Sequence, residues 1–518
     1  MTDTDSAIGR ARPYDKTDLV LIIALLVIAT AIRLLYLQLI PVFTDEAFEV
    51  LAAYSIYQGE FTAFGPVNPT AGPLFAYLVA LSFWLLGPQF LLPRILVMTI
   101  GVLTVGLTYV LGRSIGGRWA GAIAGALLAF SPVHTIVNSH IAWSNSTTPF
   151  FITLAFIVLH RSLRRKNGPL LVLGGFLYGL SLQTHVSMLV VAPGLVVWFL
   201  ARRDILNLLR KPWPYLAGGA ALLGYLNMII FNLMTRGGSL TDVQNHDYAW
   251  VAEPTWAIYW TNIKNMVVEV GPTFGGMVPR ISDPMSALVA GLLLIWLVVA
   301  LIYAAGRRET MPLLVVLSTA LIMPYFNRRY AGLLSQRYVS FLLPICFSAM
   351  GFLAADAIGS LRRQGSPPTR VMAAGSMVLV ILLALYPVRN TLTHYAIETQ
   401  AGRDNSLSLS MAMHLSETLP ADSDLFLSSH LRGSRGDGGY RYLRSLFYAL
   451  VLEGKEPFVL DLPDIVTRLE SDQAGETWLV LPPDDYETLS QRFELKRIEG
   501  SPKVHNDGML VRYVSTNP

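Results

Sequence analysis

The chain has 518 residues, 53% of them hydrophobic and only 14% charged, whereas an average soluble domain carries about 25% charged residues, so the composition excludes a water-soluble globular protein. The formal net charge of +4 is unevenly spread, because residues 1–387 hold 26 Lys and Arg against 16 Asp and Glu while residues 388–518 hold 13 against 19. The basic residues stand in short segments between apolar runs and form no patch interleaved with aromatics, so nucleic acid is not an expected partner.

Eleven apolar runs approach or reach the length of about 20 residues that a helix needs to cross a bilayer. Residues 1–16 are polar, and the first run follows them without an obvious cleavage site, so we expect a cytoplasmic N-terminus and a retained first helix. Together the runs predict a transmembrane domain over residues 17–387. The expected spans are residues 17–40, 95–112, 118–133, 147–160, 169–184, 186–201, 213–234, 286–305, 311–326, 338–358 and 370–387.

The sidedness of the loops depends on a twelfth, shorter apolar stretch at residues 73–87. If that stretch does not cross, 18 of the 26 Lys and Arg residues before position 388 fall in loops on one side, as cytoplasmic loops require. We therefore predict a re-entrant or interfacial helix there, on the outer side of a plasma (inner) membrane. Residues 41–93 and 235–285 then form outer loops, the first with juxtamembrane helices at residues 47–57 and 74–86.

The last part of the chain changes character, because short β-rich runs alternate with helical patterns. This alternation is typical of an α/β domain. The β-rich runs are residues 425–428, 458–460, 478–481 and 509–514, and the helical ones are residues 405–419, 440–452 and 484–493. We expect residues 388–518 to form a small soluble α/β domain on the extracytoplasmic side.

Two adjacent acids follow the first expected span, in the sequence PVFTDEAFE at residues 41–49. One interpretation is structural, with Thr44 capping a helix whose first turn is enriched in acids by the helix dipole. The other is functional, with the carboxylate of Asp45 placed at the bilayer surface to deprotonate an acceptor hydroxyl. The two interpretations do not exclude each other, and Glu46 is a candidate beside Asp45.

Further motifs follow the acidic pair in a fixed order. They are NPTAGPL at 68–74, Leu86-Gly87, Arg94, YVLGR at 109–113, Gly116-Gly117, Ser131-Pro132, SHIAWSN at 139–145 and Gln336-Arg337-Tyr338. The series resembles the lipid-carrier-dependent glycosyltransferases of the GT-C fold, a group that includes protein O-mannosyltransferases and aminoarabinose transferases. The likeness covers roughly residues 17–200 and is thinner beyond them.

This resemblance implies a multi-pass α-helical membrane protein of the GT-C type that moves a sugar from a polyprenyl-phosphate donor to an extracytoplasmic acceptor. It implies that Asp45 is the base or the acceptor-binding acid and that Glu46 supports it. Many relatives have a second Asp where this chain has Asn145, so we expect no metal ligand set here, and either metal-independent chemistry or an indirect role for a divalent metal. Asn145 is predicted to contact substrate, although a helix N-cap is an alternative reading.

Seven basic residues lie on the outer side under this topology, against the usual distribution. They are Arg94, Arg236, Lys264, Arg280, Arg328, Arg329 and Arg337. A guanidinium binds phosphate through two parallel hydrogen bonds, and the resemblance associates the Arg337-Tyr338 pair with the donor phosphate. Arg337, Tyr338, Arg94 and Arg329 are therefore predicted to bind it. The alternative is that Arg337 and Tyr338 anchor a helix at the headgroups.

Three histidines are predicted to contact substrate. His185 lies between two apolar segments at an outer helix end, His140 has a similar place, and His246 lies in the long outer loop with Trp250 and Trp256. Loops of this length are often functional. The alternatives are a hydrogen-bonded histidine at a helix end and aromatics that merely mark the membrane interface.

The leading hypothesis is an inverting glycosyltransferase of the cell envelope in which Asp45 and Arg337 serve one cavity at the outer rim. The competing class is a non-catalytic transporter or binding protein for lipid-linked glycans. Transporters place ionisable groups at mid-membrane, and Asp and Glu are nearly absent from the expected spans. The pattern therefore favours the enzyme and leaves the sugar and the acceptor unidentified.

Overall fold

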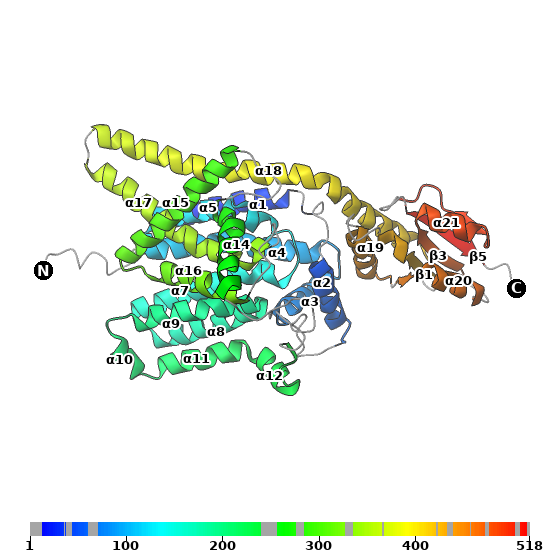
Figure 1. Cartoon of the computed structure of the whole chain (residues 1–518), viewed down its shortest axis with the longest axis horizontal. Coiled ribbons are helices and arrows are strands. Elements are labelled where there is room, and N and C mark those ends of the chain that lie inside the picture. The colour runs from blue at the N-terminus through cyan, green and yellow to red at the C-terminus, as the bar shows by residue number, and fades with distance from the viewer. Residues whose placement is uncertain are drawn as a thin grey trace. The chain divides into compact units, whose positions relative to one another are not determined.

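The computed structural model describes residues 13–35, 37, 44–60, 71–239, 256–275, 284–326, 335–364, 367–420, 423–432, 439–455, 457–471, 476–502 and 508–514. These residues are mostly helical, and a small sheet lies near the C-terminus (Figure 1). The chain divides into two compact units. The first holds Met1–Leu35, Thr62–Phe75 and Val97–His394, and the second holds Tyr36–Phe61, Ala76–Leu96 and Tyr395–Pro518.

The first unit is a bundle of apolar helices. Its elements are α1 (Lys16–Leu34), most of α4 (Leu92–Gly116), α5 (Arg118–Ala129), α6 (Pro132–Ile136), η2 (Ser144–Thr147), α7 (Thr148–Arg165), α8 (Gly168–Thr184), η3 (Val186–Val191), α9 (Ala192–Leu200), α10 (Ile205–Leu209), α11 (Trp213–Gly224), α12 (Leu226–Met234), α14 (Trp256–Gly275), α15 (Pro284–Gly306), α16 (Met311–Phe326), η4 (Ser335–Tyr338), η5 (Ser340–Leu342), α17 (Leu343–Gln364) and the first half of α18 (Pro367–Thr418).

Five helices of the described residues are long and apolar enough to cross a membrane. They are Lys16–Leu34, Leu92–Gly116, Ser144–Arg165, Pro284–Gly306 and Ser340–Arg363. The pair α11 and α12, bent by 63°, counts as a sixth if it is one span, and shorter apolar helices accompany them. The multi-pass helical architecture is as predicted, while the count of eleven crossings stays a prediction.

Glycines let the helices of this bundle approach at backbone distance. A Cβ atom at Gly175 on α8 would lie 2.1 Å from the Ala217 carbonyl oxygen on α11, and one at Gly179 would lie 2.1 Å from the Ala221 carbonyl oxygen. Apolar helices in lipid gain no hydrophobic energy from associating, so close packing at small residues has to hold them together. The α8–α11 contact therefore depends on the absence of side chains at these positions.

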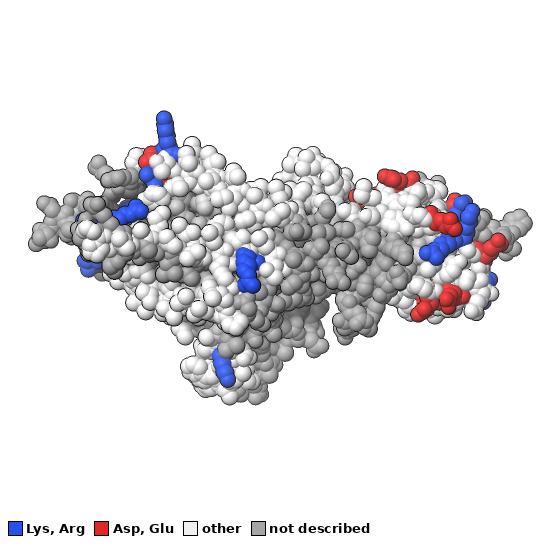
Figure 2. Space-filling view, turned by 90° about the horizontal axis from the view of Figure 1, so that it is seen from above, with Lys and Arg blue, Asp and Glu red and all other residues white. Residues whose placement is uncertain are grey.

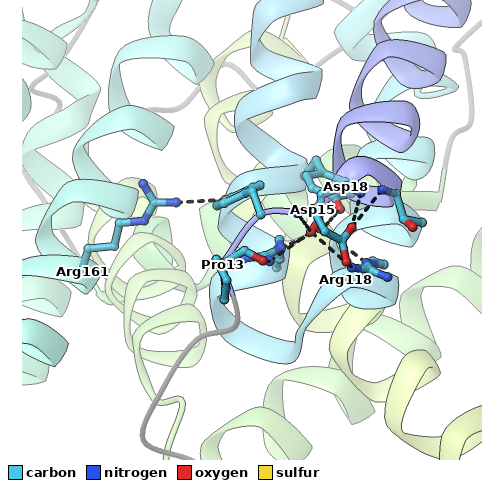
Figure 3. A network of polar contacts seen from close by, with 9 residues as sticks. Pro13, Asp15, Asp18, Arg118 and Arg161 are labelled. Carbon is cyan, nitrogen blue, oxygen red and sulfur yellow. Dashed lines mark hydrogen bonds and ion pairs between the residues drawn. The ribbon is translucent and has the colours of Figure 1, made fainter.

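A network of hydrogen bonds and ion pairs surrounds the first turn of α1 (Figure 3). Asp15 caps the helix by accepting the Thr17 and Asp18 amides at 2.9 and 3.1 Å. The buried Asp18 accepts the Tyr109 hydroxyl at 2.5 Å and Arg113 Nε at 2.8 Å. Hydrogen bonds to the Asp18 carboxylate thus attach the first turn of α1 to the end of α4. Such charge-assisted hydrogen bonds are shorter and stronger than those between neutral groups.

The second unit combines several helices with a five-stranded sheet. Its elements are α2 (Thr44–Tyr57), most of α3 (Leu74–Leu86), the second half of α18, β1 (Asp424–Ser428), η6 (Ser429–Arg432), α19 (Gly439–Leu452), β2 (Phe458–Leu460), α20 (Leu462–Ser471), β3 (Glu476–Leu481), α21 (Pro483–Ser490), β4 (Leu495–Arg497) and β5 (Met509–Val514). The strand order is β2-β1-β3-β5-β4, with β1 parallel to β2 and β3, and β5 antiparallel to β3 and β4.

The sheet has its own apolar core between strands and helices. Phe426, Leu479 and Val511 from the strands pack with Ile465 and Leu469 from α20. On the face drawn in Figure 2, charged side chains gather over the part that holds this sheet, whereas the bundle surface is largely uncharged. The contrast matches a soluble domain that follows a membrane-embedded one.

The predicted α/β character of the tail is confirmed, with two additions and one difference. The four predicted strands are β1, β2, β3 and β5, whereas β4 and α20 were not predicted from the sequence. A single helix, α18, runs from Pro367 to Thr418, so the predicted boundary at residue 388 falls inside a helix. The change from apolar to polar residues there does not end the helix. The domain limits themselves stay a prediction.

Substitution of Gly175 by Ala should destabilise the bundle, because the new methyl group would collide with a backbone carbonyl that cannot move alone. Overpacking of this kind costs about 1–3 kcal/mol. The matched control is Gly219→Ala on α11, where a Cβ atom would meet nothing within 4 Å. Thermal unfolding in detergent should show a lower Tm for Gly175→Ala alone, and equal values for the two variants would contradict the packing described.

Candidate active site

The two candidate acids lie in the first turn of α2, where the helix dipole favours negative charge. Asp45 is half-buried, whereas Glu46 is fully buried. The acidic first turn of the structural interpretation is therefore present, whereas Thr44, the expected cap, is itself the first residue of α2. The functional interpretation of Asp45 stays a prediction.

Glu46 forms a buried ion pair with Arg94 at the start of α4. Arg94 donates from Nε to Oε1 at 2.7 Å and from Nη2 to Oε2 at 2.9 Å, and both side chains are fully buried. A third donor, Nη1, reaches the Leu37 carbonyl at 3.0 Å. Bidentate pairs of this kind combine geometric specificity with strength, so the pair fixes the first turn of α2 and with it the backbone of Asp45.

A tyrosine of the C-terminal region completes this cluster. Helix α19 packs against α2, and the fully buried Tyr448 donates its hydroxyl to the Phe90 carbonyl at 3.3 Å, with the two rings 5.1 Å apart. Burial and the nearby Glu46 carboxylate raise the pKa of the Tyr448 phenol well above its ordinary value, so the group stays a donor. Sequence reasoning missed Tyr448, whose only signal is its place on the apolar face of an amphipathic helix.

A second cluster forms in the first unit around Arg337. The guanidinium carbon lies 4.6 Å from the centre of the Trp143 ring and 4.7 Å from that of Tyr338. Nη2 donates to the Tyr338 hydroxyl at 2.7 Å. Stacking on aromatic faces orients a guanidinium. The predicted pair Arg337-Tyr338 is thus joined by Trp143, which was not among the predicted site residues.

His185 belongs to the same cluster. It follows the last residue of α8, and its ring centre lies 5.4 Å from that of Tyr338. Its Nδ1 accepts the Ser187 amide at 3.1 Å, which places the ring proton of the neutral form on Nε2. Burial and the Arg337 charge lower the pKa of His185 to about 3. The side chain is therefore a neutral Nε2–H donor at physiological pH.

Asn145 lies in η2, which packs against η4, the element that carries Arg337. Its side chain is buried, and Oδ1 has no hydrogen-bond partner. The alternative reading of Asn145 as a helix N-cap is wrong, because α7 begins at Thr148 and its N-cap is Thr147. The structure thus brings Asn145, His185 and the Arg337-Tyr338 pair into one neighbourhood of the first unit.

Comparison with known proteins agrees with this architecture. Residues 68–231 match the sequence family described as dolichyl-phosphate-mannose-protein mannosyltransferase. The fold is similar to that of ArnT from Cupriavidus metallidurans bound to undecaprenyl phosphate, with a TM-score of 0.59 and 14% identity over 97% of this chain and 99% of ArnT. The apo state of ArnT gives a TM-score of 0.58 and 14% identity over 95% and 97% of the two chains. Comparison with curated protein sequences gives no match.

The chain is a membrane glycosyltransferase of the GT-C fold. The fold class and the enzyme class predicted from the ordered motifs are confirmed. The structural likeness extends over nearly the whole chain, and it therefore includes the thinly matched region beyond residue 200.

Other predicted site residues of this glycosyltransferase lie elsewhere or outside the described residues. Arg94 forms its buried ion pair with Glu46. Its contact with the donor phosphate stays a prediction. The ring nitrogens of His140 face the carbonyl oxygens of Thr135 at 2.6 Å and Leu35 at 3.3 Å, so its substrate contact also stays a prediction. Arg329 and His246 lie outside the described residues.

The described part of the glycosyltransferase offers no group of three or more His, Cys, Asp or Glu side chains that could hold a metal ion. Three protein ligands are the usual minimum of a catalytic metal site. An indirect role for a divalent metal stays a prediction.

Removal of the Glu46 carboxylate should destabilise the second unit, because it leaves a buried guanidinium without its anion. Breaking a buried pair in this way costs about 3–5 kcal/mol. Glu46→Gln should therefore unfold at a clearly lower temperature in detergent. The double variant with Glu46→Met and Arg94→Met should recover most of the loss, since it removes both charges. A wild-type Tm for Glu46→Gln would contradict the assignment.

The neutral state of His185 predicts a pH effect on stability. Below its ordinary pKa of 6.5 the unfolded chain binds a proton at this side chain, whereas the folded enzyme does not until the pH falls towards 3. Stability is therefore lost as pH falls from 6.5. His185→Gln, which cannot titrate, should lose less Tm between pH 7 and pH 5 than the wild type does. Identical pH dependence of the two proteins would show that His185 is already protonated in the folded state.

Proposed function

We propose that this enzyme transfers a sugar from a polyprenyl-phosphate donor to an acceptor hydroxyl on the extracytoplasmic side, with inversion at the anomeric carbon. The observation that carries the proposal is the Arg337 cluster, in which a cation held on aromatic faces lies beside a neutral imidazole donor. Such a set fits a lipid-linked phosphate. The matched family is named for a dolichyl-phosphate-mannose donor, and ArnT was solved with undecaprenyl phosphate, which supports this ligand class.

In the proposed reaction the acceptor oxygen attacks the anomeric carbon as the bond from that carbon to the phosphate oxygen breaks. The acceptor proton passes to the Asp45 carboxylate, and the electron pair of the broken bond leaves with the phosphate. Arg337 and the Nε2–H of His185 stabilise the charge that grows on the departing phosphate. Electrostatic stabilisation of this type often supplies the largest part of the rate acceleration, and Glu46 with Arg94 holds the helix that carries the base.

In the proposed orientation the protein lies in the plasma membrane, with its N-terminus on the cytoplasmic side and the C-terminal sheet on the outer side. Arg113 and Arg118 surround the start of α1, and Arg161 reaches Tyr14 beside them (Figure 3). Such a concentration of basic residues at one end of the bundle supports a cytoplasmic location for that end.

Asp45→Asn should reduce transfer by about 10²–10⁴-fold, the range for loss of a general base, while binding of undecaprenyl phosphate stays at the wild-type level. Transfer is measured with purified enzyme in detergent, where a transporter has no second compartment to serve. Asp204→Asn, which removes an acid of a surface ion pair, is the matched control and should transfer normally. Wild-type turnover by Asp45→Asn would refute the role of this carboxylate.

Arg337→Ala should weaken binding of undecaprenyl phosphate by roughly tenfold or more, because a hydrogen bond to a charged group contributes about 1.5–3 kcal/mol. The measurement is direct binding of the lipid phosphate to the purified enzyme. Arg236→Ala, another basic residue predicted on the outer side, is the control and should bind normally. Equal affinity of Arg337→Ala and wild type would place the donor phosphate elsewhere.

A further inference from the structure

A cavity lies between the last turns of α17 and the first half of α18, two consecutive helices of the first unit (Figure 1). Its volume is about 550 Å³, and Arg362 from α17 lines it together with Ala374, Met377, Val378 and Ile381 from α18. The spacing of the four α18 residues places them on one face of the helix. The lining is therefore an apolar stripe with a guanidinium beside it.

The cavity belongs to the end of the bundle that we propose faces the cytoplasm. A Cβ atom at Gly116, the last residue of α4, would lie 2.4 Å from Cδ2 of Phe352 on α17, which places this part of α17 beside the helix end that carries Arg113. Arg362 lies further along α17, in its last turn. The α18 residues of the lining fall inside the expected span 370–387, so the stripe faces hydrocarbon and the guanidinium is within reach of the headgroups.

The cations near this cavity differ in their partners. Asp356 accepts a hydrogen bond from Arg307 at 3.1 Å and lies 3.8 Å from Arg363, so one carboxylate serves two guanidiniums. Arg362 is exposed, and among the described residues the polar contact of its guanidinium is the Met377 sulfur, 3.5 Å from Nη2. A thioether is a weak acceptor. Three guanidiniums beside one carboxylate leave an excess of positive charge next to an apolar surface.

The chemistry of the lining suits an amphipathic anion. A phosphate matches a guanidinium through two parallel hydrogen bonds, and an acyl chain matches the apolar stripe. Basic pockets between membrane helices on the cytoplasmic side are typical binding sites for anionic phospholipid head groups. A zwitterionic lipid fits less well, because its own ammonium group offsets the phosphate charge. The lipid-linked sugar donor is not the expected occupant, since its proposed phosphate site at Arg337 is predicted on the outer side.

We propose that this cavity binds an anionic phospholipid of the cytoplasmic leaflet, with the phosphate on Arg362 and an acyl chain along the stripe from Ala374 to Ile381. The inference goes beyond the proposed function and rests on the proposed orientation. The bound lipid fills the space between α17 and α18 and so joins the first half of α18 to the bundle. The folded enzyme therefore gains stability from one class of membrane lipid.

The test compares phosphatidylglycerol with phosphatidylcholine, each added to the delipidated full-length enzyme in detergent. Phosphatidylglycerol should raise the Tm and stay bound in native mass spectrometry, because a ligand that binds only the folded state stabilises it. Phosphatidylcholine at the same concentration should do so much less. Arg362→Gln should bind phosphatidylglycerol at least about tenfold more weakly, as expected for a lost hydrogen bond to a charged group. Equal binding of the two lipids by the wild type would overturn the proposal.

Two pairs of variants separate this cavity from the general charge of the surface. Arg203→Gln removes another exposed cation of the predicted cytoplasmic side and should keep wild-type binding of phosphatidylglycerol. Ala374→Phe fills the cavity and should lose the bound lipid although Arg362 is present, whereas Val371→Phe, on the same helix but not in the lining, should keep it. If Arg203→Gln loses as much affinity as Arg362→Gln, or if Ala374→Phe binds like the wild type, the cavity is not the site. Should Ala374→Phe fail to fold, the two arginine variants still decide.

Undecaprenyl phosphate identifies the occupant. At equal concentration it should not displace phosphatidylglycerol, and Arg362→Gln should bind it with wild-type affinity. Displacement, or loss of undecaprenyl phosphate binding in Arg362→Gln, would assign the cavity to the lipid carrier and overturn the proposal. The proposed donor site is tested separately by Arg337→Ala, so the two proposals can fail independently.

Discussion

A guanidinium withdrawn from water has to be surrounded by acceptors, and this requirement organises both units. Arg94 meets it with the carboxylate of Glu46 and the carbonyl of Leu37. Arg33, also fully buried, donates to Ser139 Oγ at 3.0 Å, among other acceptors, and contacts His134 Nδ1 at 2.8 Å. Each contact joins segments that are far apart in sequence, so satisfying the buried charge also fixes the path of the chain.

Arg337 differs from Arg33 and Arg94 in that aromatic rings flank its guanidinium. Its side chain is half-buried and lies against the rings of Trp143 and Tyr338. Ring faces attract a cation through their quadrupole and do not neutralise it, whereas the carboxylate of Glu46 neutralises Arg94. A guanidinium held in this way keeps its orientation. The lowered pKa of His185 fits the same picture, because a second positive charge there would be repelled.

The sequence predicts those parts of the fold that follow from one stretch of residues at a time. Apolar runs give the bundle helices, alternating patterns give β1, β2, β3 and β5, and the ordered motifs give the fold class. β4 has only three residues, two of them exposed and basic, so no apolar alternation marks it. The continuation of α18 past residue 387 could not be predicted either, because the apolar run ends there and the polar residues that follow are equally good helix formers.

Pairing is what single positions do not reveal. From the sequence, Arg94 was a basic residue on the predicted outer side and a candidate for binding phosphate. Only the three-dimensional structure shows that its guanidinium donates to Glu46, 48 residues earlier in the chain. Asn145 was open to two interpretations, because a polar residue before an apolar run is a common N-cap, and the actual helix start at Thr148 excludes only that one. Trp143 was not predicted as a site residue, because its contact with Arg337 joins segments that are far apart in sequence.

The C-terminal region packs against α2, the helix that carries the proposed base Asp45. Helix α19 packs on α2, and Tyr448 lies against Phe90 close to the buried pair that fixes Asp45. A change in the packing of α19 would therefore act on the ion pair of Glu46 and Arg94, which holds the first turn of α2. Since the pair has two charges in a dry environment, small displacements change its energy steeply.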